Sequence, residues 1–322
     1  MLTSLHIENF RAFRNLEVDG LARVNLIAGG NSTGKTALLE GLVFFVDDPQ
    51  GDKVRDLAKL FRATNPQAPG YDFWNWLLHD RSPNGGCRFM GTTTGSRKFE
   101  RSWSLKRRER QPGDKHFFEV RQLGSHDGYA WGDPAPSRGF LATFSTFPGN
   151  PYQDALDFNR VILKKRRRRV EELLRQIDDR LVSIESLQSG SGPMLYADIG
   201  LPEMIPVTQL GQGFNRLLDI YSELVAEEAK LLVIDEVEGG LYWKALPVVW
   251  KGLFAAAREW DVQVFATTHS AECIRAADEA ARQGGEYDLA VIRLDRVDGE
   301  IKATTMGEET LRTAKEFNWE LR

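Results

Sequence analysis

The stretch GGNSTGKT, residues 29–36, decides the fold class of this 322-residue chain. It fits the pattern G-x-x-x-x-G-K-[ST], which is typical of loops that bind the phosphates of a nucleotide. Upstream, Arg23–Ala28 predicts a short buried strand, and downstream, Ala37–Phe45 predicts the opening of a helix. Because such a loop connects a strand to a helix, its setting supports the motif as strongly as its letters do. The alternative is a chance match, which is expected in about one of a hundred chains of this length.

Each residue type in this loop has a chemical task. Glycines let the backbone curve around a phosphate chain with its N–H groups, and the N-terminus of the following helix adds partial positive charge. Lys35 is predicted to reach the β- and γ-phosphates, and the Thr36 hydroxyl is predicted to ligate Mg²⁺. The residues expected to bind the nucleotide here are Gly29, Gly30, Asn31, Ser32, Thr33, Gly34, Lys35, Thr36 and Ala37.

The composition predicts an ordinary soluble, cytoplasmic protein. Hydrophobic residues make up 42% and charged residues 27% of the chain, and no apolar run reaches the roughly 18 residues of a membrane span. The segment Met1–Phe10 carries polar residues and Glu8, unlike a secretory signal. Cys87 and Cys273 lie far apart, which favours a reducing compartment and argues against a zinc site. The net charge of −4 gives no global basic field to attract nucleic acid.

The two ends of the chain are predicted to form one α/β core, from residues 1–50 and 191–322. Apolar runs in the C-terminal part predict buried strands at Lys230–Ile234, Asp261–Thr268 and Leu289–Leu294.

Residues 51–150 are predicted to form a β-rich insertion. Short extended runs separated by glycine and proline indicate antiparallel strands. These runs are Cys87–Thr92, Lys98–Leu105, His116–Leu123 and Gly139–Phe147.

Residues 151–190 are predicted to form a helical arm. Within it, Tyr152–Leu187 indicates one or two helices, and Ser189–Pro193 indicates a linker. Apolar residues seven apart mark one helix face: Leu156, Leu163, Val170, Ile177 and Ile184. Since so few heptads do not make a coiled coil, we expect an arm or hairpin packed on the core.

A second candidate site element is the apolar run Leu231–Ile234 with the two acids that follow it. Acids at the carboxyl end of a central parallel strand lie where ligands bind in such sheets. Asp235 is predicted to hold Mg²⁺, and Glu236 is predicted to accept a proton from the attacking water. The alternative is an ordinary strand end with solvated acids.

His269 follows the predicted strand that ends at Thr268. Because polar groups at neighbouring strand ends meet at one edge, we expect His269 to sense the γ-phosphate. The alternative is a structural histidine.

The loop Leu210–Arg216 contains two glycines ahead of an amphipathic helix that runs to about Glu228. Its free N–H groups and helix end offer a second phosphate cradle. One nucleotide does not need two cradles, so this loop is predicted to bind the γ-phosphate held by a second copy of the chain. The alternative is a plain glycine-rich helix start. The contacts expected here come from Leu210, Gly211, Gln212 and Gly213.

Together these elements resemble the ABC-type ATPases in order and spacing. The segments Ile7–Arg11, Asp235–Tyr242 and Thr267–Ser270 are similar to the RecF/SMC-related AAA ATPases of the OLD (overcoming lysogenization defect) type. The resemblance covers about 1–50 and 190–322, and it implies a P-loop NTPase fold with an ABC-ATPase-like core that uses ATP and Mg²⁺.

The same resemblance implies a homodimer that closes head to tail on two ATP molecules. It implies that Glu236 is the general base, that His269 is the switch histidine and that Glu238–Leu241 communicates across the dimer. Gly211 stands where the common signature serine would be, so backbone N–H groups replace its hydroxyl contact. Arg11, with Arg14, is expected to approach the adenine or phosphates as in related ATPases; a surface-strand role is the alternative.

The leading hypothesis is an ATPase that drives or gates a separate effector protein, a nuclease or toxin, in nucleic-acid maintenance, DNA repair or antiviral defence. Many OLD-like proteins carry a Toprim nuclease domain, but the acids after His269 lack its D-x-D pair, so nuclease activity in this chain is not expected. The alternative is a slow ATP-sensing scaffold that holds such an effector inactive. A transporter subunit is a weaker third interpretation.

The sharpest charge feature is the basic run Lys164–Arg169. One interpretation is contact with nucleic-acid phosphates. The other is a solvated helix, in which Glu171 and Glu172 pair with arginines one turn earlier. The aromatic cluster Tyr71–Trp76 indicates core or a docking surface, with base stacking as the alternative.

Overall fold

The computed structural model describes residues 1–46, 75–82, 85–96, 98–107, 118–123, 142–145, 151–190, 192–226 and 230–316. These residues form two compact units. The first unit comprises Met1–Ala22, Ala28–Leu141 and Ile292–Met306, and the second comprises Arg23–Ile27, Ala142–Val291 and Gly307–Arg322. Most of the predicted aromatic cluster, Tyr71–Trp74, lies outside the described residues, and Trp76 is exposed.

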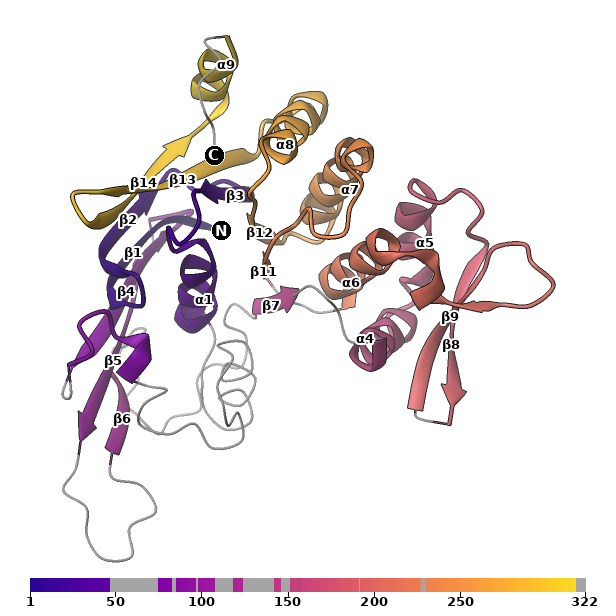
Figure 1. Ribbon diagram of the computed structural model, residues 1–322, viewed down its shortest axis with the longest axis horizontal. Coiled ribbons are helices and arrows are strands. Elements are labelled where there is room, and N and C mark those ends of the chain that lie inside the picture. Colours follow the sequence, from indigo (N-terminus) through magenta and orange to yellow (C-terminus); the bar gives the residue numbers. More distant parts are fainter. Residues whose placement is uncertain are drawn as a thin grey trace, which may run out of the picture. The chain divides into compact units, whose positions relative to one another are not determined.

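The first unit is built on a five-stranded antiparallel sheet with the order β2-β1-β4-β5-β6 (Figure 1). Its strands are β1 (Leu2–Phe10), β2 (Phe13–Asp19), β4 (Gly86–Thr93), β5 (Lys98–Arg107) and β6 (Phe118–Leu123). Alternating residues of β1 are buried, as expected for a sheet with one covered face. The antiparallel β insertion predicted from the sequence is confirmed for β4, β5 and β6.

Helix α1 (Lys35–Val46) packs its apolar face on this sheet. Phe44 of α1 contacts the rings of Phe10 and Phe89. Phe10 and Phe89 in turn pack edge to face, with their ring centroids 5.1 Å apart. Gly41 lies so close to the sheet that a Cβ there would be 3.1 Å from Ile7 Cδ1. The sheet therefore provides a rigid support for the helix that follows the phosphate loop.

The second unit contains a parallel sheet in which β7 (Ala142–Ser145), β11 (Leu231–Ile234) and β12 (Gln263–Thr267) are neighbours. The first residues of β3 (Val24–Gly29) pair with β12, also in parallel. β11 and β12 are buried along their whole length, which explains the continuous apolar run of β11 and the apolar centre of β12, Val264–Ala266. The strands predicted at 230–234 and 261–268 are thus confirmed.

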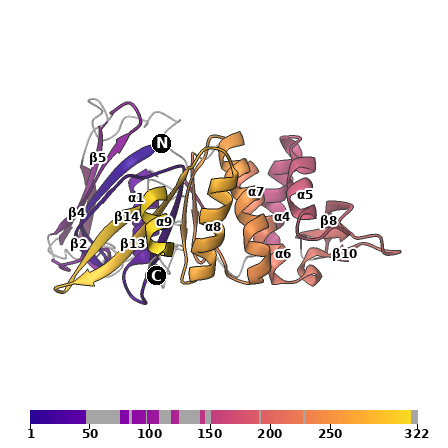
Figure 2. The same ribbon diagram turned by 90° about the horizontal axis from the view of Figure 1, so that it is seen from above.

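Helices cover this sheet and extend the unit. α6 (Gln212–Ala226), α7 (Leu246–Glu259) and α8 (Ala271–Gln283) stand side by side (Figure 2). α4 (Pro151–Leu163) and α5 (Arg167–Arg175) pack on α6, next to a small antiparallel sheet ordered β10-β9-β8. Its strands are β8 (Ser183–Ser189), β9 (Gly192–Asp198) and β10 (Ile205–Pro206).

The remaining strands are β13 (Leu289–Val297) and β14 (Glu300–Met306), followed by α9 (Glu308–Glu316). Residues Leu289–Val291 of β13 belong to the second unit, and Ile292–Val297 belong to the first with β14. In the first unit Thr305 Oγ1 donates to the Asp19 carbonyl at 2.7 Å, which joins β14 to β2.

Two expectations about the middle of the chain are wrong. The run at 139–147 was expected in the antiparallel insertion, but β7 pairs in parallel with β11, Leu231 opposite Ala142. The predicted helix to Leu187 ends at Arg175 in α5, and Ser183–Leu187 belong to β8. An extended run does not reveal its partner, because strand pairing depends on residues distant in sequence.

The apolar residues spaced seven apart do not form one helix face, and the predicted linker does not separate domains. Leu163 is 81% exposed at the end of α4, whereas Val170 in α5 and Ile184 in β8 are buried. The seven-residue spacing therefore crosses three elements and is no helical seam. Ser189 pairs with Gly192, so the Ser/Gly-rich stretch joins β8 to β9 as a hairpin and does not separate domains.

Candidate functional site

The phosphate loop connects β3 to α1, as the sequence predicts. Gly29 has φ +145°, and a Cβ there would lie 2.5 Å from the Leu294 carbonyl oxygen, so the position requires glycine. Gly34 has φ +89°, and a Cβ would lie 2.9 Å from the Phe13 ring. The curve of the loop is thus fixed by close packing at both of its ends.

Lys35 points back into this loop from the first turn of α1. Its side chain is buried, and Nζ donates to the carbonyl oxygens of Gly29 at 2.9 Å and Gly30 at 2.8 Å. Thr33 Oγ1 also donates to the Gly30 carbonyl at 2.9 Å. The ammonium is held where the loop would enclose phosphate groups.

Two arginines lie beside the loop in the same unit. Arg11 Nε is 3.0 Å from Glu40 Oε2 on α1, so its expected contact with the nucleotide stays a prediction. Arg296 donates weakly to the Ser32 carbonyl, at 3.5 Å. Sequence reasoning missed Arg296 because it lies 264 residues from Ser32 and belongs to no motif.

The two acids of the second unit follow β11 directly. Asp235 is half-buried, and Glu236 is exposed with the left-handed φ of +48°. Thr267, the last residue of β12, donates its hydroxyl to Asp235 Oδ1 at 2.6 Å and accepts the Glu236 N–H at 2.8 Å. The sequence predicts these acids at a strand end, but it names Thr267 only within a segment of family resemblance and predicts no role for it.

His269 follows Thr268 just after the end of β12, and it is exposed. Its backbone N–H donates to Glu238 Oε1 at 2.8 Å, and the Thr268 hydroxyl donates to the same oxygen at 2.8 Å. Ser270 then caps α8 by accepting the Cys273 N–H. The loop after β11 is thereby fastened to the loop after β12.

The glycine-containing loop ends a 3₁₀ turn, Val207–Leu210, and α6 begins at Gln212. Gly211 has φ +92°, and Asn215 Nδ2 donates to its carbonyl at 2.7 Å. Gly211 and Gln212 are exposed residues at the start of a 15-residue helix, where N–H groups have no partner within the helix. This loop and Gly240–Tyr242 together line a cavity of about 250 Å³.

Arg216 joins this helix to the acids. Its side chain is 1% exposed, and a terminal nitrogen donates to the Asp235 carbonyl oxygen at 2.6 Å. Asp219 Oδ2 lies 3.6 Å away. Burial lowers the pKa of the guanidinium, while the carboxylates of Asp219, Asp235 and Glu236 oppose that shift.

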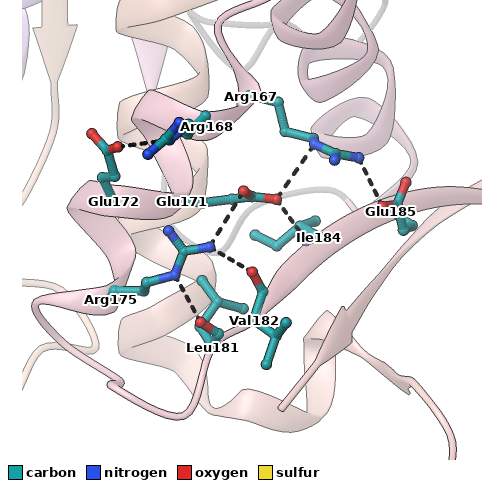
Figure 3. Close-up of polar contacts among 9 residues, drawn as sticks. All are labelled: Arg167, Arg168, Glu171, Glu172, Arg175, Leu181, Val182, Ile184 and Glu185. Carbon is teal, nitrogen blue, oxygen red and sulfur yellow. Dashed lines mark hydrogen bonds and ion pairs between the residues drawn. The ribbon is translucent and has the colours of Figure 1, made fainter. Parts of the chain in front are cut away.

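Arginines at the end of the basic run form ion pairs with glutamates, and Figure 3 shows those of Arg167 and Arg168. The basic run spans the turn between α4 and α5, not a single helix. Arg167 is 2.7 Å from Glu185 and Arg168 is 3.2 Å from Glu172, while Arg169 is 3.0 Å from Glu259. These ion pairs favour the interpretation of an internally paired helix over a contact with nucleic acid.

The structure also bears on metals and membranes. Among the residues that it describes, no three His, Cys, Asp or Glu side chains gather into a group that could hold a metal ion. Within the same part of the chain, no helix has the length and apolar character needed to cross a bilayer.

Comparison with known proteins identifies relatives at the level of family and fold. Residues 94–275 match the family model described as "AAA domain, putative AbiEii toxin, Type IV TA system", and residues 4–68 match a second AAA-domain model. A Helicobacter pylori protein named ATP/GTP phosphatase is 23% identical over 332 residues, covering 88% of this chain and 89% of its own.

Solved structures of Smc heads share the fold. A head bound to the C-winged helix domain of ScpA aligns with a TM-score of 0.62 and 12% identity, over 97% of this chain and 99% of that one. A Pyrococcus furiosus head bound to the C-terminal domain of ScpA aligns with a TM-score of 0.60 and 10% identity, over 98% and 99%. The predicted fold class, an α/β P-loop NTPase core, is confirmed, because the chain matches AAA-domain models and shares the fold of the Smc heads.

Proposed function

This chain belongs to the AAA ATPase family that its residues 94–275 match, and on that premise we propose that it binds ATP with Mg²⁺ and hydrolyses it. The observation that carries the proposal is the buried Lys35 ammonium, held inside a loop in which Gly29 and Gly34 have no room for a Cβ. The name of the Helicobacter pylori relative, ATP/GTP phosphatase, supports a triphosphate as the ligand.

In this proposal the loop binds the triphosphate and Lys35 neutralises it. The ammonium exchanges its carbonyl partners for the β- and γ-phosphates, and the N-terminus of α1 adds N–H donors. A charge-assisted hydrogen bond of this kind contributes about 1.5–3 kcal/mol. Loss of the Lys35 ammonium is therefore expected to weaken nucleotide binding by about 10–150-fold.

The oxygen donors present fit Mg²⁺. We assign Thr36 and Asp235 as its protein ligands, because Mg²⁺ prefers hard oxygen donors and is usually held by one or two carboxylates with substrate phosphates. When bound, Mg²⁺ supplies positive charge to the phosphates.

Glu236 and His269 complete the proposed chemistry. The exposed Glu236 carboxylate accepts the proton of the attacking water, and His269 contacts the γ-phosphate. β3 links the two sets of residues along the chain, since its first residues pair with β12 and its last, Gly29, begins the loop.

We further propose that two copies close on ATP head to tail. The N–H groups of the exposed residues Gly211 and Gln212 then meet the γ-phosphate bound by the partner. Gly213 supports this assignment, since a Cβ there would be 3.1 Å from the Gly240 carbonyl, which joins the loop to residues 238–241. ATP turnover is proposed to drive or gate a separate effector, a nuclease or toxin, in defence or nucleic-acid maintenance.

ATP and GTP hydrolysis by the purified chain tests the core of this proposal. Lys35→Ala is expected to bind ATP at least about tenfold more weakly, the loss of one charged hydrogen bond. Glu236→Gln is expected to retain binding and lose about 10²–10⁴-fold in turnover. Lys302→Ala and Glu203→Gln, at exposed positions, are the matched controls. Unchanged ATP affinity in Lys35→Ala would overturn the loop assignment.

A further inference from the structure

We propose that Thr267 is the positioning residue for both acids of the site: through its hydroxyl it sets the metal affinity of Asp235 and the conformation of Glu236. This inference rests on the proposed function, because it assumes that Asp235 binds Mg²⁺ beside a nucleotide. It rests on three hydrogen bonds that converge on one buried residue.

The register of the two strands brings Thr267 to the acids. β11 and β12 are parallel, with Ile234 opposite Ala266, so the next residue on each strand places Asp235 beside Thr267. Both residues lie at the carboxyl edge of the sheet. Thr267 is 1% exposed, so its hydroxyl exchanges no hydrogen bonds with bulk water.

The Thr267 hydroxyl both donates and accepts a hydrogen bond. As a donor it reaches Asp235 Oδ1 at 2.6 Å, and as an acceptor it takes the Glu236 N–H at 2.8 Å. The Thr267 carbonyl also accepts the Val237 N–H at 3.0 Å. The segment Asp235–Val237 thus makes three hydrogen bonds to Thr267, two with its hydroxyl and one with its carbonyl.

These contacts have a consequence for metal binding. A hydroxyl that donates to one carboxylate oxygen fixes the orientation of the carboxylate, as the supporting partners of metal ligands do. Losing such a supporting partner commonly costs about 10–100-fold in metal affinity or activity. Thr267 therefore acts on the metal through Asp235, without contacting it.

The hydrogen bonds of Thr267 also affect Glu236, the proposed general base. Glu236 has φ +48°, a left-handed conformation that a residue with a side chain adopts only when its surroundings impose it. The Glu236 N–H bond to Thr267 is part of that constraint, and it sets the direction of the carboxylate. One threonine thereby couples the metal ligand to the base.

The test compares Thr267→Val, Thr267→Ser and Thr268→Val. Valine preserves the shape of Thr267 without its hydroxyl, and serine restores the hydroxyl. Thr268 is an equally buried neighbour whose hydroxyl donates to Glu238 instead. The readouts are Mn²⁺ affinity by electron paramagnetic resonance with a non-hydrolysable ATP analogue, and affinity for that analogue in EDTA.

We expect Thr267→Val to bind Mn²⁺ about 10–100-fold more weakly, with analogue affinity in EDTA unchanged within about twofold. Serine restores Mn²⁺ binding, and Thr268→Val leaves it unchanged. If Thr267→Val binds Mn²⁺ with wild-type affinity, or if Thr268→Val loses as much affinity, the inference is overturned and the proposed function still stands. A wild-type chain that binds no analogue overturns the proposed function and the inference together. If Thr267→Val does not fold, Thr267→Ala also lacks the hydroxyl and carries the same expectation.

Discussion

At the scale of single residues, the buried guanidinium of Arg216 is an unusual feature of the second unit. Arg216 is buried beneath Asp235, where its guanidinium donates to the Asp235 carbonyl at 2.6 Å. Removing a buried charge from water is costly unless nearby groups compensate for the loss of hydration. Asp219, Asp235 and Glu236 supply that compensation. The same side chain belongs to α6, so the helix behind the glycine loop and the acids share one anchor.

Arg216→Met is therefore expected to lower the free energy of unfolding by about 3–5 kcal/mol, because it strands buried acceptors and Asp219. Urea-induced unfolding followed by circular dichroism measures this change. Arg275→Met, at an exposed position of α8, is the control and is expected to stay within about 0.5 kcal/mol. Equal stability of the two variants would show that Arg216 is not an anchor.

At the scale of elements, hairpin β8–β9 is fastened to α5 by Glu171. Its side chain is 6% exposed and accepts the Ile184 N–H at 3.0 Å, with Arg167 and Arg175 each 3.5 Å away (Figure 3). Arg175 also donates to the Leu181 carbonyl at 2.8 Å. A buried carboxylate between two arginines organises the turn where the sequence predicted continued helix.

Glu171→Ala is expected to destabilise the chain by about 1–3 kcal/mol, because it leaves the buried Ile184 N–H without its acceptor and removes one ion-pair partner each from Arg167 and Arg175. Glu172→Ala removes the neighbouring, 41% exposed carboxylate and is expected to cost less than about 1 kcal/mol. Hydrogen exchange across residues 183–198 locates the effect. Faster exchange in both variants alike would contradict the distinction between the two glutamates.

The elements that the sequence predicted correctly are those whose signal is local. The loop between β3 and α1 needs particular glycines, β11 needs a continuous apolar run and β12 needs an apolar centre, so each is visible in its own residues. The partner of β7 and the end of α5 depend on distant contacts, such as Ala142 with Leu231. Thr267 and Arg216 were missed for the same reason: their roles come from pairing across strands and helices.

At the scale of the whole molecule, the proposed function requires two copies of the chain. In that proposal the phosphate loop and the acids supply one side of a nucleotide, whereas the exposed residues Gly211 and Gln212 at the start of α6 serve the nucleotide of the other copy. If hydrolysis separates the copies, a chain that binds ATP without hydrolysing it should accumulate as the dimer. Glu236→Gln is the variant expected to do so, because it retains the loop and loses the base.

Sedimentation equilibrium with ATP and Mg²⁺ is expected to give twice the 36.4 kDa of one chain for Glu236→Gln, and the mass of one chain without ATP. Adding Lys35→Ala should keep it monomeric, since no nucleotide is held. Adding Gln212→Glu is the sharper control: this exposed first residue of α6 tolerates an acid, but the new charge repels the partner's γ-phosphate. That double variant should bind ATP as a monomer, and a dimer there would place the interface elsewhere.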